Sequence, residues 1–280
     1  GNKDPNKASI CGLVGGLFPD LDVLIKSGKD PLLFLEYHRH FTHSLFFVPI
    51  GGLIVSSILF VLFFRKKITF GKIFLFSSLG ILTHGLLDAC TSYGTNLYWP
   101  INDSRISWSI ISIVDPVFTL ILICSFCLCI KFKSKVFSRI GLSLSMIYLL
   151  IGLFKYNLIL EFVKKLSHER GHQIERVFLN PTIGNNILWR SVYQFDGNYY
   201  VDAVYMPLLS KVNYKEGSSV NTIDIENIFQ NIDANSQLIK DIYRFSFFSQ
   251  GYIYFHPNLE NVIADLRYGT LPFDLNSLWG

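Results

Sequence analysis

Long apolar stretches alternate with short polar ones over the first part of this 280-residue chain. Four segments, 43–64, 70–90, 108–130 and 140–160, each hold about 20 residues and at most two Asp, Glu, Lys or Arg. A bilayer core needs roughly 20 apolar residues in helical conformation. These segments therefore predict membrane-spanning helices, and the stretch 8–18 predicts a further apolar helix that is too short to span alone.

Beyond residue 160 the pattern changes to short runs of alternating β-formers. Segments 189–195 and 199–205 flank Asp196-Gly197-Asn198, a sequence typical of a β-hairpin turn. Helical spacing over 234–247 and strand-like runs at 251–255 and 262–268 follow. These elements predict a small α+β domain.

We therefore predict a mainly α fold in two parts. Residues 1–160 form a polytopic membrane helix bundle of four to five helices, and residues 161–280 form a small C-terminal α+β domain outside the membrane.

Composition and charge support this division. The chain is 50% hydrophobic and only 16% charged, whereas soluble domains average about 25% charged residues. Residues 1–160 carry 15 Lys and Arg against 8 Asp and Glu, and residues 161–280 carry 10 against 13. This uneven distribution excludes a single soluble globule, a disordered chain and a nucleic-acid module with a basic face, so we expect the lipid bilayer as a partner and no nucleic acid.

The basic residues also predict an orientation, because short loops rich in Lys and Arg stay in the cytoplasm. The loops after the first and third predicted spans are both basic. This predicts a multi-pass membrane protein with segments 19–42 and 91–107 and the C-terminal domain on the non-cytoplasmic side. The basic residues of the two loops are Arg65, Lys66, Lys67 and Lys72, and then Lys131, Lys133, Lys135 and Arg139.

Acidic and histidine side chains of the membrane part gather at one predicted depth. None of its eight carboxylates lies in 37–87 or 116–160. Each falls on the predicted outer side or in the outer portion of a helix, and so do His38, His40, His43 and His84. Ionisable groups in or at a membrane are costly and usually mark function. The convergence of separate segments on one depth therefore indicates a site.

The first motif of this site is Pro19-Asp20-Leu21-Asp22, which follows the short apolar helix. Its two carboxylates, two residues apart, can both point at one cation. A simple turn or helix cap is the alternative, since Asp is common in turns next to Pro.

The second motif is the segment 38–44, His-Arg-His-Phe-Thr-His-Ser, directly before the first predicted span. His38 and His43 are candidate metal ligands. Arg39 is a candidate for binding an anionic group such as phosphate with two parallel hydrogen bonds. A wet interfacial loop with basic anchors is the alternative.

The third motif, His84-Gly85-Leu86-Leu87-Asp88, places a His and an Asp four residues apart on one helix face. They can bind one metal, or form a buried hydrogen-bonded pair. Asp115-Pro116 is the fourth motif, and there Pro is expected to kink the third span. Asp115 is a candidate ligand, partner of a His ligand, or general base.

A divalent metal would also neutralise carboxylates that otherwise repel each other near lipid. Mixed His and carboxylate ligation favours Zn²⁺, with Mn²⁺ or Fe²⁺ as alternatives. The candidate ligands are Asp20, Asp22, His38, His43, His84 and Asp88, and the candidate catalytic residues are Arg39 and Asp115. A salt bridge from Asp115 to Arg39 or Arg105 is the structural alternative.

Together these motifs resemble the YdjM-like family of inner-membrane-associated metal-dependent hydrolases. The resemblance covers nearly the whole chain and is most specific in the His-Arg-x-x-Thr-His-Ser block. It implies a polytopic membrane protein with metal-dependent hydrolase activity. Members usually carry Thr-His or Thr-Gln in a short helix before the Pro-Asp turn, and this sequence begins after that point. The matching pieces are 19–22, 38–44, 84–88, Asp115-Pro116 and 265–269.

The same motifs are distantly similar to the zinc-dependent phospholipase C and P1-nuclease group of helical phosphoesterases. That similarity implies Asp20 or Asp22, His43, His84 and Asp88 as zinc ligands.

Our leading hypothesis is a membrane-bound metal-dependent hydrolase acting on a phosphoester or lipid-linked substrate at the membrane interface. The alternative is a non-catalytic membrane protein whose soluble domain binds a partner, its polar cluster only packing helices. A metal or proton transporter is disfavoured because the spans offer no polar residues toward the cytoplasmic side.

Overall fold

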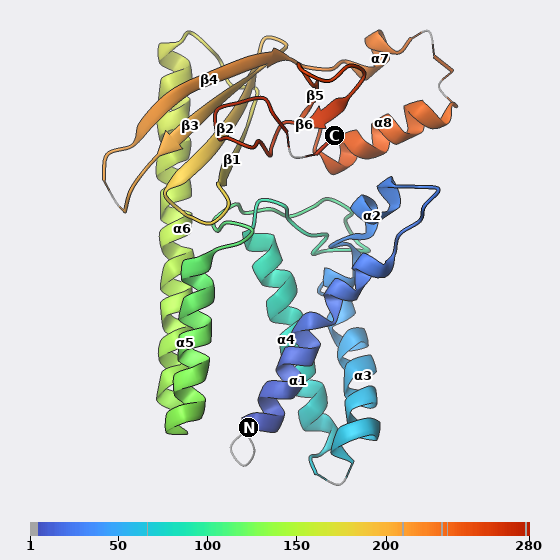
Figure 1. The fold of residues 1–280 in the computed structure, drawn as a ribbon, viewed down its shortest axis with the longest axis vertical. Coiled ribbons are helices and arrows are strands. Elements are labelled where there is room, and N and C mark those ends of the chain that lie inside the picture. Colours follow the sequence, from blue (N-terminus) through green and yellow to red (C-terminus); the bar gives the residue numbers. More distant parts are fainter. Residues whose placement is uncertain (1–4, 66, 209, 231, 234, 278) are drawn as a thin grey trace. The chain divides into compact units, whose positions relative to one another are not determined.

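The protein is described by a computed structural model that covers residues 5–65, 67–208, 210–230, 232–233, 235–277 and 279–280. The chain folds into two compact units, residues 1–108 and 109–280 (Figure 1). Lys66, which belongs to the first predicted basic loop, and Asp4, one of the eight carboxylates, lie outside the described residues.

The N-terminal unit consists of helices and short helical turns. Its longer helices, α1, α3 and α4, lie side by side, and the short elements η1, α2 and η2 gather at one end of them (Figure 1). In chain order the elements are α1 (Pro5–Leu17), η1 (Pro19–Leu24), α2 (Leu32–Tyr37), η2 (Phe41–His43), α3 (Phe47–Leu59), the π turn η3 (Phe60–Phe64) and α4 (Phe70–Cys90).

Helices α1 and α4 approach each other closely through small residues. A Cβ atom at Gly80 would overlap the carbonyl oxygen of Gly12, and one at Gly15 would overlap the backbone of Ser77. Small residues at such positions let helix backbones come into direct contact, as in many membrane helix pairs. The Ser77 hydroxyl also donates to the Cys11 carbonyl at 3.3 Å. The packing holds the end of α1, and with it η1, against α4.

Two helical segments of this unit are long and apolar enough to cross a membrane, Phe47–Phe64 and Phe70–Cys90. The predicted span 43–64 therefore begins four residues later than expected. His43 belongs to the separate turn η2, and the Ser44 hydroxyl accepts a hydrogen bond at 3.2 Å from the Phe47 N–H, the first of α3.

The C-terminal unit begins with an antiparallel helix pair, α5 (Pro116–Phe132) and α6 (Lys135–Glu169). Helix α6 is long and apolar enough to span, whereas α5 is a shorter apolar helix of 17 residues, at the lower end of the length that crosses a bilayer. The prediction of a kinked span over 108–130 is wrong. Asp115 caps the helix and Pro116 occupies its first turn, where the missing N–H costs nothing.

The far end of α6 packs against a four-stranded antiparallel sheet of order β1-β2-β3-β4. Ile159 and Val163 of α6 share a buried cluster with Trp189, Tyr193 and Val204 of the sheet. The predicted boundary at residue 160 therefore falls inside one continuous helix. The strands are β1 (Arg176–Pro181), β2 (Leu188–Phe195), β3 (Asn198–Tyr205) and β4 (Asn213–Asn221).

The predicted hairpin is confirmed, since Phe195 pairs with Asn198 across the two-residue turn Asp196-Gly197. Both turn residues have positive φ, 46° and 68°, as a type I′ turn requires. The opposite face of the sheet packs on Tyr252 and Leu266. The segments after the sheet are α7 (Ile225–Ile228), α8 (Gln237–Phe248), β5 (Ile253–Phe255) and β6 (Ile263–Asp265). The predicted mainly α fold with a small α+β domain is therefore confirmed.

Candidate metal centre

The 3₁₀ turn η1 places the two carboxylates of the Pro-Asp motif in different environments. Pro19 starts the turn, and its fixed φ suits that position. The Asp22 side chain is fully buried, whereas the Asp20 side chain is 45% exposed. Asp20 is thus the carboxylate of this motif that can meet an incoming molecule.

The segment before η2 turns sharply at Arg39, whose φ of +61° lies in the left-handed region. Few residues other than Gly adopt this conformation, and surrounding bonds usually enforce it. Here the Arg39 N–H donates to Asp22 Oδ2 at 2.9 Å, and its carbonyl accepts from the Asn96 N–H at 3.1 Å and the Thr95 hydroxyl at 3.0 Å. The turn directs His38 and His43 toward η1.

Helix α4 supplies His84 and Asp88 from one face, and Gly85 between them allows η2 to approach. A Cβ atom at position 85 would lie 2.5 Å from the carbonyl oxygen of His43. Only Gly avoids this contact, so the ligand-bearing turn and the ligand-bearing helix can touch.

Four side-chain atoms meet at this contact: Asp20 Oδ1, His43 Nε2, His84 Nε2 and Asp88 Oδ2. His43 Nε2 lies 3.1 Å from His84 Nε2, 3.2 Å from Asp88 Oδ2 and 3.6 Å from Asp20 Oδ1. His84 Nε2 lies 3.4 Å from both carboxylate oxygens. Asp20, His43 and His84 alone already form a group whose ligand atoms could hold a metal ion.

The separations among Asp20, His43 and His84 fit three positions of a tetrahedral metal site, and Asp88 Oδ2 lies at similar distances from both imidazole nitrogens. Zinc ligands at 2.0–2.1 Å in a regular tetrahedron are separated from each other by roughly 3.3–3.4 Å, and the five distances above fall on both sides of that value. Asp88 Oδ2 is also buried and faces the two imidazole nitrogens, with Arg39 Nε 3.3 Å away. A buried carboxylate oxygen that faces two imidazole nitrogens is the arrangement that a cation would satisfy.

Asp22 lies one layer further out, behind His43. Its Oδ2 is 3.2 Å from His43 Nδ1 and accepts from the Thr42 hydroxyl at 3.0 Å, and its Oδ1 is 2.9 Å from His38 Nδ1. In metal sites a carboxylate on the second imidazole nitrogen fixes the tautomer and the ring orientation. The structure thus brings all six predicted ligands together. Asp22, however, contacts the Nδ1 atoms of His43 and His38, and neither Asp22 nor His38 supplies an atom of the four-atom cluster.

The charges of the cluster shift one another's protonation. Contacts with His43, and then with His84, hold the pKa of the Asp20 carboxyl well below its usual range. Burial alone would raise the pKa of Asp22, but hydrogen bonds with His38 and His43 lower it. Burial likewise opposes a charge on His43, yet the carboxylates of Asp20, Asp22 and Asp88 raise its pKa to about 10. Without a metal, the cluster therefore holds a proton on His43 at neutral pH.

Arg39 borders the cluster on the Asp88 side. Its Nε lies 3.3 Å from Asp88 Oδ2, and its Nη1 donates to the Thr91 hydroxyl at 3.1 Å. The guanidinium lies over the Tyr93 ring, 5.0 Å from the centroid. Arg39 Nε is buried and has no hydrogen-bond partner among the described residues.

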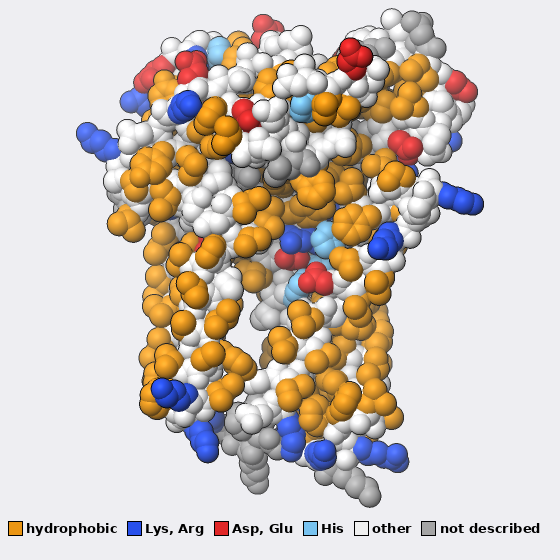
Figure 2. Space-filling model, viewed as in Figure 1, with side chains coloured by type: hydrophobic (Ala, Val, Ile, Leu, Met, Phe, Trp, Pro, Cys, Tyr) orange, Lys and Arg blue, Asp and Glu red, His pale blue; other side chains and the backbone are white. Residues whose placement is uncertain are grey.

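Sequence reasoning missed the segment 91–97, which forms hydrogen bonds to Arg39 beside the cluster. Its residues are all buried, and Thr91, Thr95 and Asn96 form the bonds to Arg39 given above. The available signal was that four of the six residues after the apolar helix, at positions 91, 92, 95 and 96, are small and polar. Figure 2 shows a group of acidic, basic and histidine side chains bordered by hydrophobic surface.

Asp115 belongs to the C-terminal unit, where both of its oxygens serve the local fold. Oδ1 accepts from the Phe118 N–H at 3.0 Å, and Oδ2 accepts from the Tyr148 hydroxyl at 2.7 Å. These bonds cap α5 and join it to α6. The catalytic or ligand role expected for Asp115 stays a prediction.

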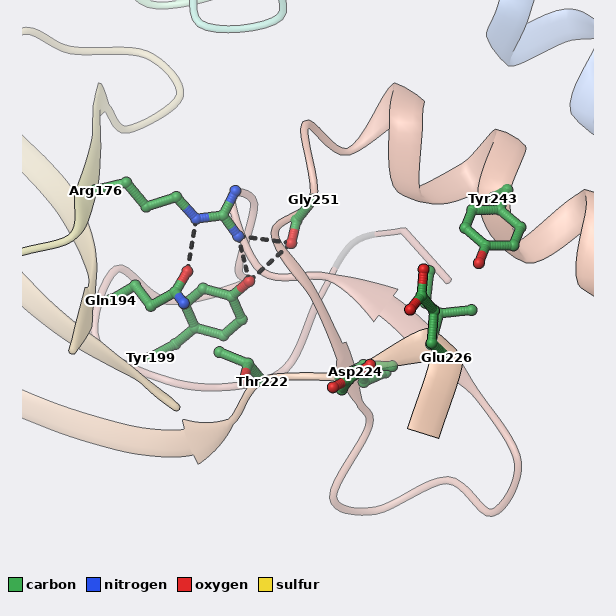
Figure 3. Close-up of a pocket in the computed structure, with 10 residues that line it drawn as sticks. Arg176, Gln194, Tyr199, Thr222, Asp224, Glu226, Tyr243 and Gly251 are labelled. Atoms are coloured by element: carbon green, nitrogen blue, oxygen red, sulfur yellow. Dashed lines mark hydrogen bonds between the residues drawn. The ribbon is translucent and has the colours of Figure 1, made fainter. Parts of the chain in front are cut away.

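The same unit holds a shallow pocket of about 390 Å³ between the sheet and the segments that follow it (Figure 3). Arg176 points into it but is engaged by its neighbours, Gln194, Tyr199 and the Gly251 carbonyl. Asp224 in its wall caps α7 through the Asn227 N–H. The polar groups of this pocket are thus largely used by the fold.

Comparison with known proteins identifies relatives of the chain. The family model described as YdjM inner membrane protein matches residues 1–159. The "Uncharacterized protein YfhP" of Bacillus subtilis (strain 168) is 27% identical over 177 residues, which are 62% of this chain and 52% of YfhP. The "Inner membrane protein YbcI" of Escherichia coli (strain K12) is 32% identical over 117 residues, 39% of this chain and 64% of YbcI.

The chain thus spans between half and two thirds of the length of these relatives. No solved structure matches it. The family match covers η1, η2 and α4, and with them all four atoms of the cluster. With several helices long enough to cross a bilayer, the chain is a multi-pass membrane protein, and it belongs to the YdjM inner membrane protein family.

Proposed function

We propose that this protein is a membrane-bound metal-dependent hydrolase that acts on a phosphoester or lipid-linked substrate at the membrane interface. The observation that carries the proposal is the cluster of Asp20, His43, His84 and Asp88, in which each carboxylate has an oxygen 3.2–3.6 Å from both imidazole Nε2 atoms. Two nitrogen and two oxygen ligands favour Zn²⁺, with Mn²⁺ or Fe²⁺ as alternatives.

A divalent metal bound by these residues would act as a Lewis acid and activate water for hydrolysis near neutral pH. The chain's own residues prepare the site for it. Asp22 and Thr42 hold the His43 ring from behind, so that its Nε2 faces the cluster. Asp20 is the most exposed of the four ligands, so substrate is expected to enter from its side.

Arg39 is the residue we propose to orient an anionic substrate. Its guanidinium borders the cluster, with Nε 3.3 Å from the Asp88 carboxylate. A phosphate oxygen is a natural acceptor for such a group, because guanidinium binds phosphate in fixed geometry. The same cation also offsets the negative charge of Asp88.

The first experiment is metal analysis of the full chain purified in detergent. Wild type is compared with a His84→Ala/Asp88→Ala double variant and with His168→Ala, a control that removes an exposed histidine of α6. We expect about one equivalent of zinc per chain in wild type and control, and its loss in the double variant while helical circular dichroism is retained.

Hydrolysis is then tested on mixed micelles of phosphodiester and phosphomonoester lipids. Metal-dependent release of a phosphorylated headgroup or of phosphate that is absent in the double variant would support the proposal. A folded protein that takes up no metal even after reconstitution would contradict it. That result would favour the alternative of a non-catalytic membrane protein whose C-terminal domain binds a partner.

A further inference from the structure

A continuous chain of aromatic contacts runs across the end of the N-terminal unit that carries the metal cluster. Phe18, at the end of α1, stacks on Phe47 at 6.2 Å between ring centroids, and Phe47 contacts Phe41 at 5.8 Å. Phe41 contacts Trp99 at 6.0 Å, and Trp99 reaches His40 at 5.8 Å. We call these five rings the aromatic band.

Large aliphatic side chains stand out of the surface beside this band. In the 3₁₀ turn η1, residues three apart lie on one edge, so Leu21 and Leu24 point the same way, and they are 52% and 70% exposed. The buried Asp22 occupies the opposite side of the turn. Ile101, two residues after Trp99, is 78% exposed. Exposed apolar side chains grouped in this way mark an interaction surface.

The position of the band along the candidate spans indicates what covers it. Phe47 is the first residue of one span, and Trp99 follows shortly after the end of the other, Phe70–Cys90. Arg65 and Lys72 lie at the opposite ends of these spans. Aromatic rings concentrate where membrane helices leave the hydrocarbon core, at the level of the lipid headgroups. The band is thus continuous with the apolar helix surface that faces lipid.

We infer that the aromatic band, with Leu21, Leu24 and Ile101, inserts into the headgroup layer of the bilayer. The metal cluster then opens at the depth of the lipid phosphates, since Asp20 lies between Pro19 and Leu21 in the same turn. Contact with lipid does not depend on a metal. That an amphiphilic substrate reaches the cluster sideways from the leaflet rests on the proposed hydrolase function.

Photocrosslinking tests the lipid contact directly. The photoreactive residue p-benzoylphenylalanine replaces Ile101 or Leu24 in the full chain, which is reconstituted into phosphatidylcholine and phosphatidylglycerol vesicles with a traceable acyl chain. Leu62, 65% exposed on a spanning segment, is the lipid-facing reference. Leu208, 83% exposed in the C-terminal unit after β3, is the reference for an exposed loop leucine.

We expect lipid adducts at positions 101 and 24 with yields within about twofold of that at position 62 and clearly above that at position 208. Yields at the level of position 208 would overturn the inference. So would crosslinking of position 101 to a second copy of the chain in place of lipid. Repeating the experiment in the His84→Ala/Asp88→Ala background separates the two proposals, because lipid labelling should survive there even if metal binding is lost.

Discussion

The Nε2 atoms of His43 and His84 face each other at 3.1 Å. Two neutral imidazole nitrogens cannot both present lone pairs across this distance without repulsion, so either a proton or a cation must lie between them. Since Asp20 Oδ1 and Asp88 Oδ2 lie within 3.6 Å of the same atoms, proton and metal compete for one place. Metal affinity therefore depends both on the position of these two rings and on pH.

Gly85→Ala is expected to weaken metal binding without changing any ligand. The new Cβ would lie 2.5 Å from the backbone oxygen of His43. The turn η2 must therefore shift, and it moves His43 Nε2 away from the other atoms of the cluster. We expect zinc affinity to fall by roughly tenfold or more, because losing the contacts that orient a metal ligand has effects of this size in other metal sites. Zinc titration by competition with a chelating dye measures it.

Gly71→Ala provides the matched control, because it lies in the same helix and its Cβ would meet nothing within 4 Å. It should bind zinc as wild type does. Equal affinities for the two variants would show that the contact between η2 and α4 does not position the ligands.

Asp22→Asn tests whether Asp22 acts through His43 or as a ligand. An amide has one accepting oxygen and no charge, so it cannot accept from the Thr42 hydroxyl and the Arg39 N–H and at the same time present a second acceptor to His38 Nδ1. It also removes the negative charge beside the His43 ring. We expect zinc affinity to fall by roughly 10- to 100-fold while the stoichiometry persists. Asp20→Asn should cost more, since it removes a ligand charge.

Asp103→Asn, at an exposed position of the same unit, serves as the control for both changes. The assignment would be reversed if Asp22→Asn abolished zinc uptake and Asp20→Asn left it intact, because Asp22 would then be the ligand that the sequence alone also allowed.

Metal binding is expected to release a proton and to strengthen with pH. His43 has a pKa raised to about 10 in the metal-free cluster, so it is protonated at pH 8, whereas a metal ligand must give up that proton. The apparent zinc affinity should therefore rise by about tenfold per pH unit between pH 7 and 9 for one released proton. Calorimetry in buffers of different ionisation enthalpy counts the proton.

The direction of this pH dependence follows from the raised pKa of His43. A raised pKa stabilises the protonated, metal-free form, and this advantage disappears as the pH rises through about 10. Affinity that is independent of pH over this range would mean that His43 is neutral in the metal-free protein.

The sequence could predict which residues gather in this cluster because each motif is local. Asp20 and Asp22, the histidines of 38–44, and the pair His84 and Asp88 are short patterns of costly residues beside apolar helices. Their convergence could be expected from a common depth in the membrane. The hairpin at Asp196-Gly197 was likewise encoded locally, by residues that tolerate positive φ.

What the sequence could not decide depends on contacts distant along the chain. Whether Asp20 or Asp22 faces the cluster is determined by the backbone of Arg39 and the hydroxyl of Thr42, which both bond to Asp22. The buried segment 91–97 carries no periodic pattern, so its support of Arg39 was missed. The start of α5 at Pro116 was also missed, because an apolar run alone does not distinguish a helix from the extended chain that leads into it.

Asp115→Ala distinguishes a structural from a chemical role of this carboxylate. Asp115 is 5% exposed, caps α5 through the Phe118 N–H and accepts from the Tyr148 hydroxyl. Losing the cap costs about 1 kcal/mol, and leaving the Tyr148 hydroxyl unpaired costs about 1–3 kcal/mol more. We expect a lower thermal midpoint in detergent and an unchanged zinc content.

Tyr148→Phe is the matched control, since it removes the second bond and leaves the cap in place. Its thermal midpoint should lie between those of wild type and Asp115→Ala. The opposite pattern would be a normal midpoint in Asp115→Ala together with lost zinc or lost metal-dependent hydrolysis. Because the cap and the Tyr148 bond would then be energetically minor, that result would assign Asp115 to the chemistry of the site, as a ligand or as a base.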